Sequence, residues 1–159
     1  MNGSTHAAIG VLAGVLLARS AHGSLTETLV LAGVCGFSAL LPDVDHPNSR
    51  IRRRVGLAGD LAFGWMSHRG ITHSVVAAVA LGILAVLISP SRTAATAMAI
   101  GYSSHLVADF LTPAGVPLFA PLSWRRLRLP IITTGSLIEW ALGALITIIS
   151  LWLVGDVVL

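Results

Sequence analysis

Charged side chains are scarce in this sequence, which excludes an ordinary soluble protein. Only 11% of the 159 residues are charged and 55% are hydrophobic, whereas a typical soluble domain has about 25% charged residues. The mean hydropathy is +0.85. The length suits a single domain, which we expect to cover residues 1–159. The composition therefore predicts a membrane protein.

Several other features are also missing. The single cysteine, Cys35, cannot form an intramolecular disulfide, and its apolar neighbours favour a small buried side chain. No HExxH, Walker or GxSxG motif is present, which argues against the enzyme classes that depend on them. No positively charged segment precedes the first apolar run, so we expect that run to be mature structure and not a cleaved signal peptide.

All ten basic residues are arginines, and the calculated pI is about 10.5. A basic pI can indicate nucleic-acid binding, but these arginines lie beside apolar segments and not along a soluble basic face. We therefore expect no direct nucleic-acid partner. The lipid bilayer, anionic lipid headgroups and a lipid-phosphate substrate are the predicted partners.

Five apolar stretches predict an all-α, polytopic membrane bundle of about five helices. They cover approximately residues 6–18, 25–41, 72–89, 93–111 and 136–154. A membrane-spanning helix needs about 20 apolar residues, with about 17 as a practical minimum. The last three stretches qualify, the second is marginal, and the first is short enough to be a buried helix of a soluble protein. Two long loops, 42–70 and 112–135, join the helices on one side.

The arginines predict the orientation of this bundle. Threading five spans in order places the N-terminus and both long loops on one side of the membrane. Arg19 and Arg92 fall on the opposite side, and the other eight fall on the loop side: Arg50, Arg52, Arg53, Arg54, Arg69, Arg125, Arg126 and Arg128. By the positive-inside rule, the loop side is cytoplasmic. We expect a multi-pass protein of a bacterial or archaeal inner membrane, with its site on the cytoplasmic side.

The same threading gathers most of the metal-capable side chains on the loop side, within about 10 Å of one membrane face. Ionisable groups in membrane segments are costly and usually functional. Nine residues are therefore candidate metal ligands: His6, Asp43, Asp45, His46, His68, His73, His105, Asp109 and Glu139.

Mixed imidazole and carboxylate ligands suit Zn²⁺, with Mn²⁺ or Fe as alternatives. Nine candidates exceed the four ligands of one tetrahedral zinc, so we expect two ions, or three, bridged by a carboxylate. Some of the nine would then orient the ligand histidines instead of binding metal themselves.

Each element of this set has a simpler explanation. His105 and Asp109 are four residues apart on one helix face, where they could form a hydrogen-bonded pair that joins two helices. The DVDH segment at 43–46 could be a helix-terminal turn. His73 could merely begin a helix, and Glu139 could pair with an arginine.

The motifs together resemble a known family. These are TH at 5–6, LPDVDH at 41–46, HRGITHS at 68–74 and HLVADFLTPAGVPLFAP at 105–121. They look like the YdjM-type family, inner-membrane-associated proteins regarded as metal-dependent hydrolases and in some cases described as LexA-binding. That family is considered similar to zinc-dependent phospholipase C and P1-type nucleases. The similarity implies His105 and Asp109 as an HxxxD ligand pair, with further ligands at His6, Asp45, His68 and His73.

A phosphoesterase acting on a phospholipid or another lipid-linked phosphate is the function that we expect. The metals would activate water and polarise the phosphate. Asp45, Arg69 and His73 are the catalytic candidates, and Arg69 would bind phosphate, helped by Arg53 or Arg125. Two alternatives remain: a metal-ion transporter or sensor, and a membrane regulatory or scaffold protein of the DNA-damage response.

Overall fold

The computed structural model describes residues 1–45 and 70–157, and this part of the chain is helical. Its α-helices are α1 (Gly3–Ser20), α2 (Leu25–Ser38), α5 (Val75–Ile88), α6 (Arg92–Phe110) and α7 (Leu137–Gly155). Two short 3₁₀ helices, η1 (Pro42–Asp45) and η2 (Ile71–His73), precede and follow the part that is not described. The all-α prediction is confirmed, and each of the five apolar stretches forms a helix. In the described ranges, β pairing is confined to one isolated bridge between Val116 and Leu127.

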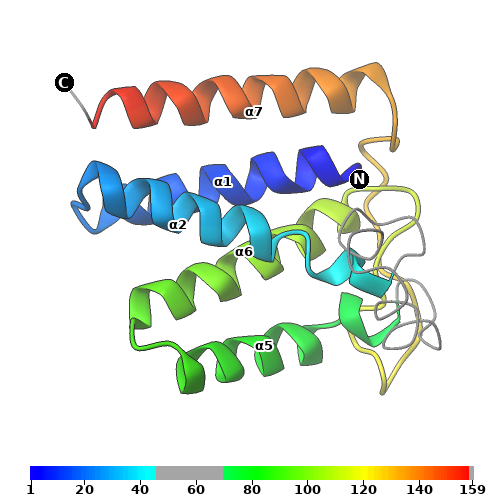
Figure 1. Cartoon of the computed structure of the whole chain (residues 1–159). Coiled ribbons are helices and arrows are strands. Elements are labelled where there is room, and N and C mark those ends of the chain that lie inside the picture. Colours follow the sequence, from blue (N-terminus) through cyan, green and yellow to red (C-terminus); the bar gives the residue numbers. More distant parts are fainter. Residues whose placement is uncertain (46–69, 158–159) are drawn as a thin grey trace, which may run out of the picture.

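The helices lie side by side, with α7 along one edge of the molecule and α5 along the other (Figure 1). Helix α1 contacts α2, α6 and α7, and α5 packs on α6. The start of α1, both 3₁₀ helices, the end of α6 and the start of α7 meet at one end, which we call the loop end (Figure 1). Helix α7 ends at the opposite end (Figure 1).

Small residues allow α1, α2 and α6 to approach closely. An added Cβ at Gly10 would lie 2.6 Å from the backbone oxygen of Cys35, and one at Gly14 would overlap the backbone of Leu31. Gly101 of α6 lies against the backbone of Cys35 in the same way. Two side chains then join α2 to α6, because Cys35 Sγ donates to the Ala97 carbonyl at 3.0 Å and Ser38 Oγ donates to the Met98 carbonyl at 2.6 Å.

The bundle buries several ionisable side chains and exposes many large apolar ones, unlike a typical soluble protein. The largest fully buried side chains include those of His6, His73, His105 and Glu139. Exposed large apolar side chains occupy the outer helices α2, α5 and α7, and include Leu29, Val30, Phe37, Val79, Ile83, Val86, Leu87, Leu137, Ile138, Trp140, Leu145, Ile148 and Trp152. Water solvates an exposed apolar surface of this extent poorly, whereas the hydrocarbon of a lipid bilayer solvates it well.

One helix of the described part, α7, is long and apolar enough to cross a membrane on its own. The sequence predicted three. Helix α5 has 14 residues, a rise of about 21 Å against a hydrocarbon thickness of about 30 Å. Helix α6 has 19 residues, but polar side chains such as Ser103, Ser104, His105 and Asp109 lower its hydropathy. The expectation that these two stretches qualify as independent spans is therefore not met.

Replacing Gly101 by alanine should destabilise the bundle by about 1–3 kcal/mol, because the new methyl group would overlap the Cys35 backbone and force α2 away from α6. Thermal unfolding of the purified protein in detergent measures this. The matched control is Gly33→Ala in α2, where an added Cβ meets nothing within 4 Å and the helix gains up to about 1 kcal/mol. Equal melting temperatures for the two variants would contradict the packing described here.

Candidate metal centre

Four helical segments bring imidazole and carboxylate groups together at the loop end. Two groups of side chains have ligand atoms that all lie within 4.8 Å of one another: His6 with His105 and Asp109, and Asp43 with His73 and His105. His105 belongs to both groups. These residues come from α1, η1, η2 and α6, so the cluster forms only when the bundle is assembled.

Carboxylate oxygens of Asp43 and Asp109 each lie near the same pair of imidazole nitrogens. His73 Nε2 and His105 Nε2 are 3.2 Å apart. Asp43 Oδ1 lies 3.6 Å from the first nitrogen and 3.8 Å from the second. Asp109 Oδ2 lies 3.9 Å and 3.8 Å from the same two nitrogens. A tetrahedral zinc with bonds of about 2.0–2.1 Å to nitrogen separates its ligands by about 3.3 Å. The ligand atoms of Asp43, His73 and His105 therefore need only small movements to bind one ion.

The His105 ring is oriented by the backbone. Its Nδ1 lies 2.7 Å from the Ala39 carbonyl oxygen, which can only accept a hydrogen bond. Nδ1 therefore carries the proton, and in the neutral ring Nε2 offers a lone pair to the cluster, as in metal-binding histidines. Sequence reasoning missed this role of Ala39, because a backbone carbonyl leaves no signal in residue type.

The His73 ring is held in a similar way. Its Nδ1 lies 3.1 Å from Thr72 Oγ1, and the Tyr102 hydroxyl of α6 donates to the Thr72 carbonyl. This contact fixes η2 against α6. Thr72 and Tyr102 were not predicted as site residues, although Thr72 is adjacent to a candidate ligand.

His6 completes the second group. Its ring stacks on that of His105, with centroids 3.7 Å apart and planes 15° apart, and its Nε2 is 3.2 Å from Asp109 Oδ1. The Met1 amino group also donates to Asp109 Oδ1. Nδ1 of His6 is buried and has no hydrogen-bond partner among the residues that the structure describes. Buried imidazole and carboxylate groups that lie this close together fit a bound cation, which satisfies their lone pairs at once.

Asp43 is the member of the cluster that solvent reaches. Its side chain is 23% exposed, whereas those of His73 and Asp109 are at most 1% exposed. Burial raises its pKa, but the imidazoles of His73, His105 and His6 oppose this and lower the pKa to about 2. Asp43 is therefore ionised at neutral pH, the form that binds metal.

Glu139 is buried at the same end, but its carboxylate is directed elsewhere. It accepts hydrogen bonds from the backbone nitrogen of Asn2 at 2.5 Å, from Asn2 Nδ2 at 3.2 Å and from the backbone nitrogen of Gly135 at 2.6 Å. The carboxylate thus binds unpaired N–H groups at the starts of α1 and α7. The structure does not bring Glu139 into either group of ligand atoms, in contrast to the sequence prediction.

The remaining candidates cannot be placed. His46, His68 and Arg69 lie outside the described residues. Asp45 ends η1, but its side chain is outside what is described. Of the three catalytic candidates, His73 is in the cluster, whereas Asp45 and Arg69 stay predictions.

Comparison with known proteins identifies the family. The sequence model described as YdjM inner membrane protein matches residues 1–158. This chain belongs to the YdjM inner membrane protein family. The membrane association expected from the composition is thereby supported.

Relatives carry the same assignment. The inner membrane protein YdjM of Escherichia coli (strain K12) is 38% identical over 123 residues, 73% of this chain and 62% of the relative; a Shigella flexneri protein of the same name matches equally. The chain therefore spans less than two-thirds of the length of these YdjM relatives. The uncharacterized protein YvsG of Bacillus subtilis (strain 168) is 30% identical over 151 residues, 94% of this chain and 92% of that protein.

No solved structure matches the chain. The family and relatives found carry no hydrolase or phospholipase description. The similarity to phospholipase C and P1-type nucleases that the motifs imply is thus unsupported by these comparisons.

His105→Ala should abolish metal binding by both groups, because His105 is their common member. Changing a group that only orients a ligand costs about 10–100-fold in affinity, so loss of the shared ligand should cost at least about 100-fold. Elemental analysis and competition with a chelator measure the effect. His22→Ala is the control, since His22 is exposed at the opposite end of α1. Unchanged metal content in His105→Ala would exclude this cluster as the binding site.

Glu139→Gln should leave the metal content unchanged but lower stability by about 1–3 kcal/mol, because a neutral amide replaces the buried acceptor of the Asn2 and Gly135 N–H groups. Thermal unfolding and elemental analysis of the same sample separate the two effects. Loss of metal without loss of stability would instead return Glu139 to the ligand set.

Proposed function

We propose that this protein is a membrane-bound, metal-dependent phosphoesterase that acts on a lipid-linked phosphate. Two groups of candidate ligand atoms that share His105, at one end of an apolar-surfaced bundle, carry this proposal. A site at the end of the helices lies at the depth of lipid headgroups, where the phosphate of a lipid is found. The proposal places the site on the cytoplasmic face of a multi-pass inner-membrane protein, as the arginine distribution predicts.

In this proposal, His73 and His105 would hold one ion together with carboxylate oxygens of Asp43 and Asp109. His6 would hold a second ion with the other oxygen of Asp109. Zn²⁺ fits the ligand types best, and Mn²⁺ or Fe would also fit. A bound ion supplies a Lewis acid that lowers the pKa of water toward about 7 and polarises phosphoryl oxygens. The Ala39 carbonyl and Thr72 hydroxyl keep the two rings aimed at the ions.

The proposed reaction is hydrolysis of a phosphate ester. The oxygen of water bonds to phosphorus, the bond from phosphorus to the lipid alcohol oxygen breaks, and the proton lost by water ends on that alcohol. The lipid phosphate would enter from the side of Asp43, the partly exposed member. Exposed Arg125, Arg126 and Arg128 in the loop between α6 and α7 would attract the anionic headgroup, and Arg69 would bind the phosphate.

A metal transporter would use the same ligand types, but in a different place. Ion pathways need polar groups along the bundle. At the far end of α1, the described residues instead form an ion pair between Arg19 and Asp156, with nitrogen and oxygen 2.7 Å apart. This position of the cluster favours chemistry at one membrane face over transport.

Purified protein loaded with Zn²⁺ should release product from dioleoyl phosphatidic acid or phosphatidylcholine in mixed micelles, measured as phosphate or as phosphocholine. A chelator should stop the release and added Zn²⁺ should restore it. His105→Ala should lower the rate at least about 100-fold, because it removes the ligand common to both groups, and His22→Ala should not. Release that is unaffected by chelator, or absent from every lipid tried while the metal remains bound, would overturn the proposed function.

A further inference from the structure

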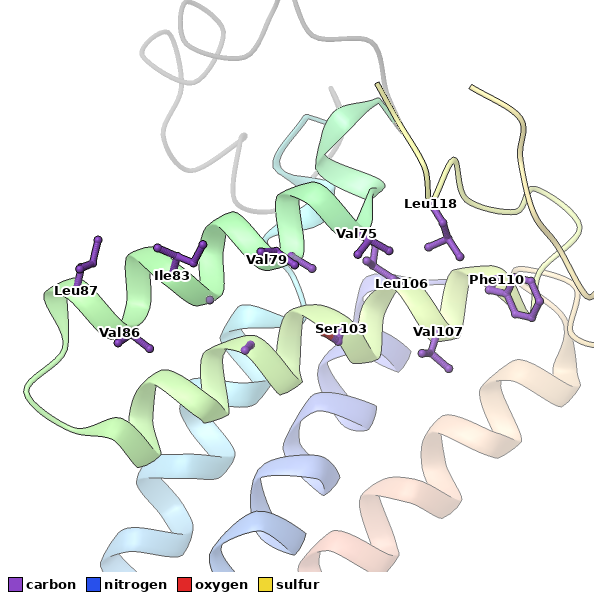
Figure 2. A pocket seen from close by; sticks show the side chains of 13 residues that line it. Val75, Val79, Ile83, Val86, Leu87, Ser103, Leu106, Val107, Phe110 and Leu118 are labelled. Carbon is purple, nitrogen blue, oxygen red and sulfur yellow. The ribbon is translucent and has the colours of Figure 1, made fainter. Parts of the chain in front are cut away.

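Two apolar grooves run along α6 on the outer surface of the bundle. Groove A, between α5 and α6, has a volume of about 810 Å³. Figure 2 shows α5 and α6 as its two walls, with Leu118 from the following loop near Val75. Groove B has a volume of about 800 Å³ and is lined on its other side by residues of α1 and α7, including Ile9 and Leu142. The two grooves are thus nearly equal in size.

The grooves are neighbours. Both are lined by Gly82 and Val86 of α5 and by Ala99, Ser103 and Val107 of α6. These shared residues form the strip along which the two grooves meet. A molecule with two apolar chains joined at one end could therefore lie in both grooves at once.

Both grooves begin beside the proposed metal centre. Groove A reaches Val75, two residues after His73, and Phe110, which follows Asp109. Groove B reaches Met1, whose amino group contacts Asp109. An occupant would therefore have its polar end at the cluster and its apolar part along the helices.

The length of groove A matches a lipid chain. Its lining extends along α5 from Val75 to Leu87, which corresponds to a rise of about 18 Å. One leaflet of a bilayer has a hydrocarbon thickness of about 15 Å, half that of the whole core. A chain that begins at the loop end would thus be covered over most of its length.

We propose that grooves A and B hold the two acyl chains of a diacyl glycerophospholipid whose phosphate lies at the metal centre. This inference rests on the proposed function and narrows its substrate class from lipid-linked phosphates in general to diacyl lipids. The match of polarity carries it, because the apolar grooves extend to the proposed metal centre. Exposed Arg125, Arg126 and Arg128 lie in the loop at the same end of the bundle. A helix of a second copy of this chain would fill apolar space but would bring no anion to that end.

A binding experiment tests the inference without turnover. The probes are non-hydrolysable phosphonate analogues of dioleoyl phosphatidic acid and of its single-chain lyso form, together with farnesyl phosphonate. Each is titrated into Zn²⁺-loaded protein in detergent and detected by native mass spectrometry. The dioleoyl analogue should bind at least about 10-fold more tightly than either single-chain probe, because a second chain buries many more methylenes.

Tryptophan substitutions then block one groove at a time. Ala78→Trp fills groove A, and Leu142→Trp fills groove B, since each residue lines that groove alone. Each should weaken binding of the dioleoyl analogue by about 10-fold, the effect of displacing about two buried methylenes. Only one of the two should affect the lyso analogue. Leu29→Trp is the control, because Leu29 is exposed on α2 and lines neither groove.

Three outcomes would overturn the inference. The first is equal affinity for diacyl and single-chain probes, and the second is unchanged binding in both groove variants. The third is a change of oligomeric state in Ala78→Trp or Leu142→Trp, because it would show that the grooves form a contact between copies of the chain. Elemental analysis of each variant must show unchanged metal. Selective diacyl binding without any hydrolysis would support the groove inference and refute the proposed phosphoesterase activity. Hydrolysis without selectivity for two chains would support the phosphoesterase activity and refute the groove inference.

Discussion

The burial of imidazole and carboxylate groups inside an apolar bundle is the constraint on which the rest of the structure depends. An isolated charge in such surroundings is very costly, so buried ionisable groups must neutralise one another or bind a cation. Three histidines and two acids meet this requirement at one end of the bundle, where their ligand atoms form two groups that share His105. They are His6, His73, His105, Asp43 and Asp109. Four separate segments must reach that point together, which ties the positions of α1, α6 and both 3₁₀ helices to one another.

The helices can meet there because their contacts are made by small residues. Gly10, Gly14 and Gly101 let the backbones of α1, α2 and α6 touch, so these helices pack by close van der Waals contact. A small apolar cluster that includes Leu31 and Cys35 lies between them. The large apolar residues are left on the outside, where lipid can solvate them. The close packing of the helices thus places ionisable side chains inside the bundle and large apolar side chains on its surface. Both features agree with membership of an inner-membrane protein family.

Two kinds of surface converge at the loop end. Asp43 opens the buried cluster to solvent, and the two grooves along α6 extend from the same end into the lipid-facing surface. A lipid phosphate has the matching division between an anionic head and an apolar body. Glu139 contributes to this end in another way, because it joins the starts of α1 and α7 through backbone N–H groups.

Composition and local pattern alone determined the helices, the membrane association and the end of the bundle at which the polar groups gather, because hydropathy and residue spacing act within single segments. The pairing of His105 with Asp109 could also be predicted, since residues four apart share a helix face. Only the tertiary structure decided that Glu139 binds backbone instead of joining the cluster, that Ala39 orients His105, and that the cluster divides into two groups sharing that ring. These depend on distances between segments far apart in the chain, and no local pattern encodes such distances.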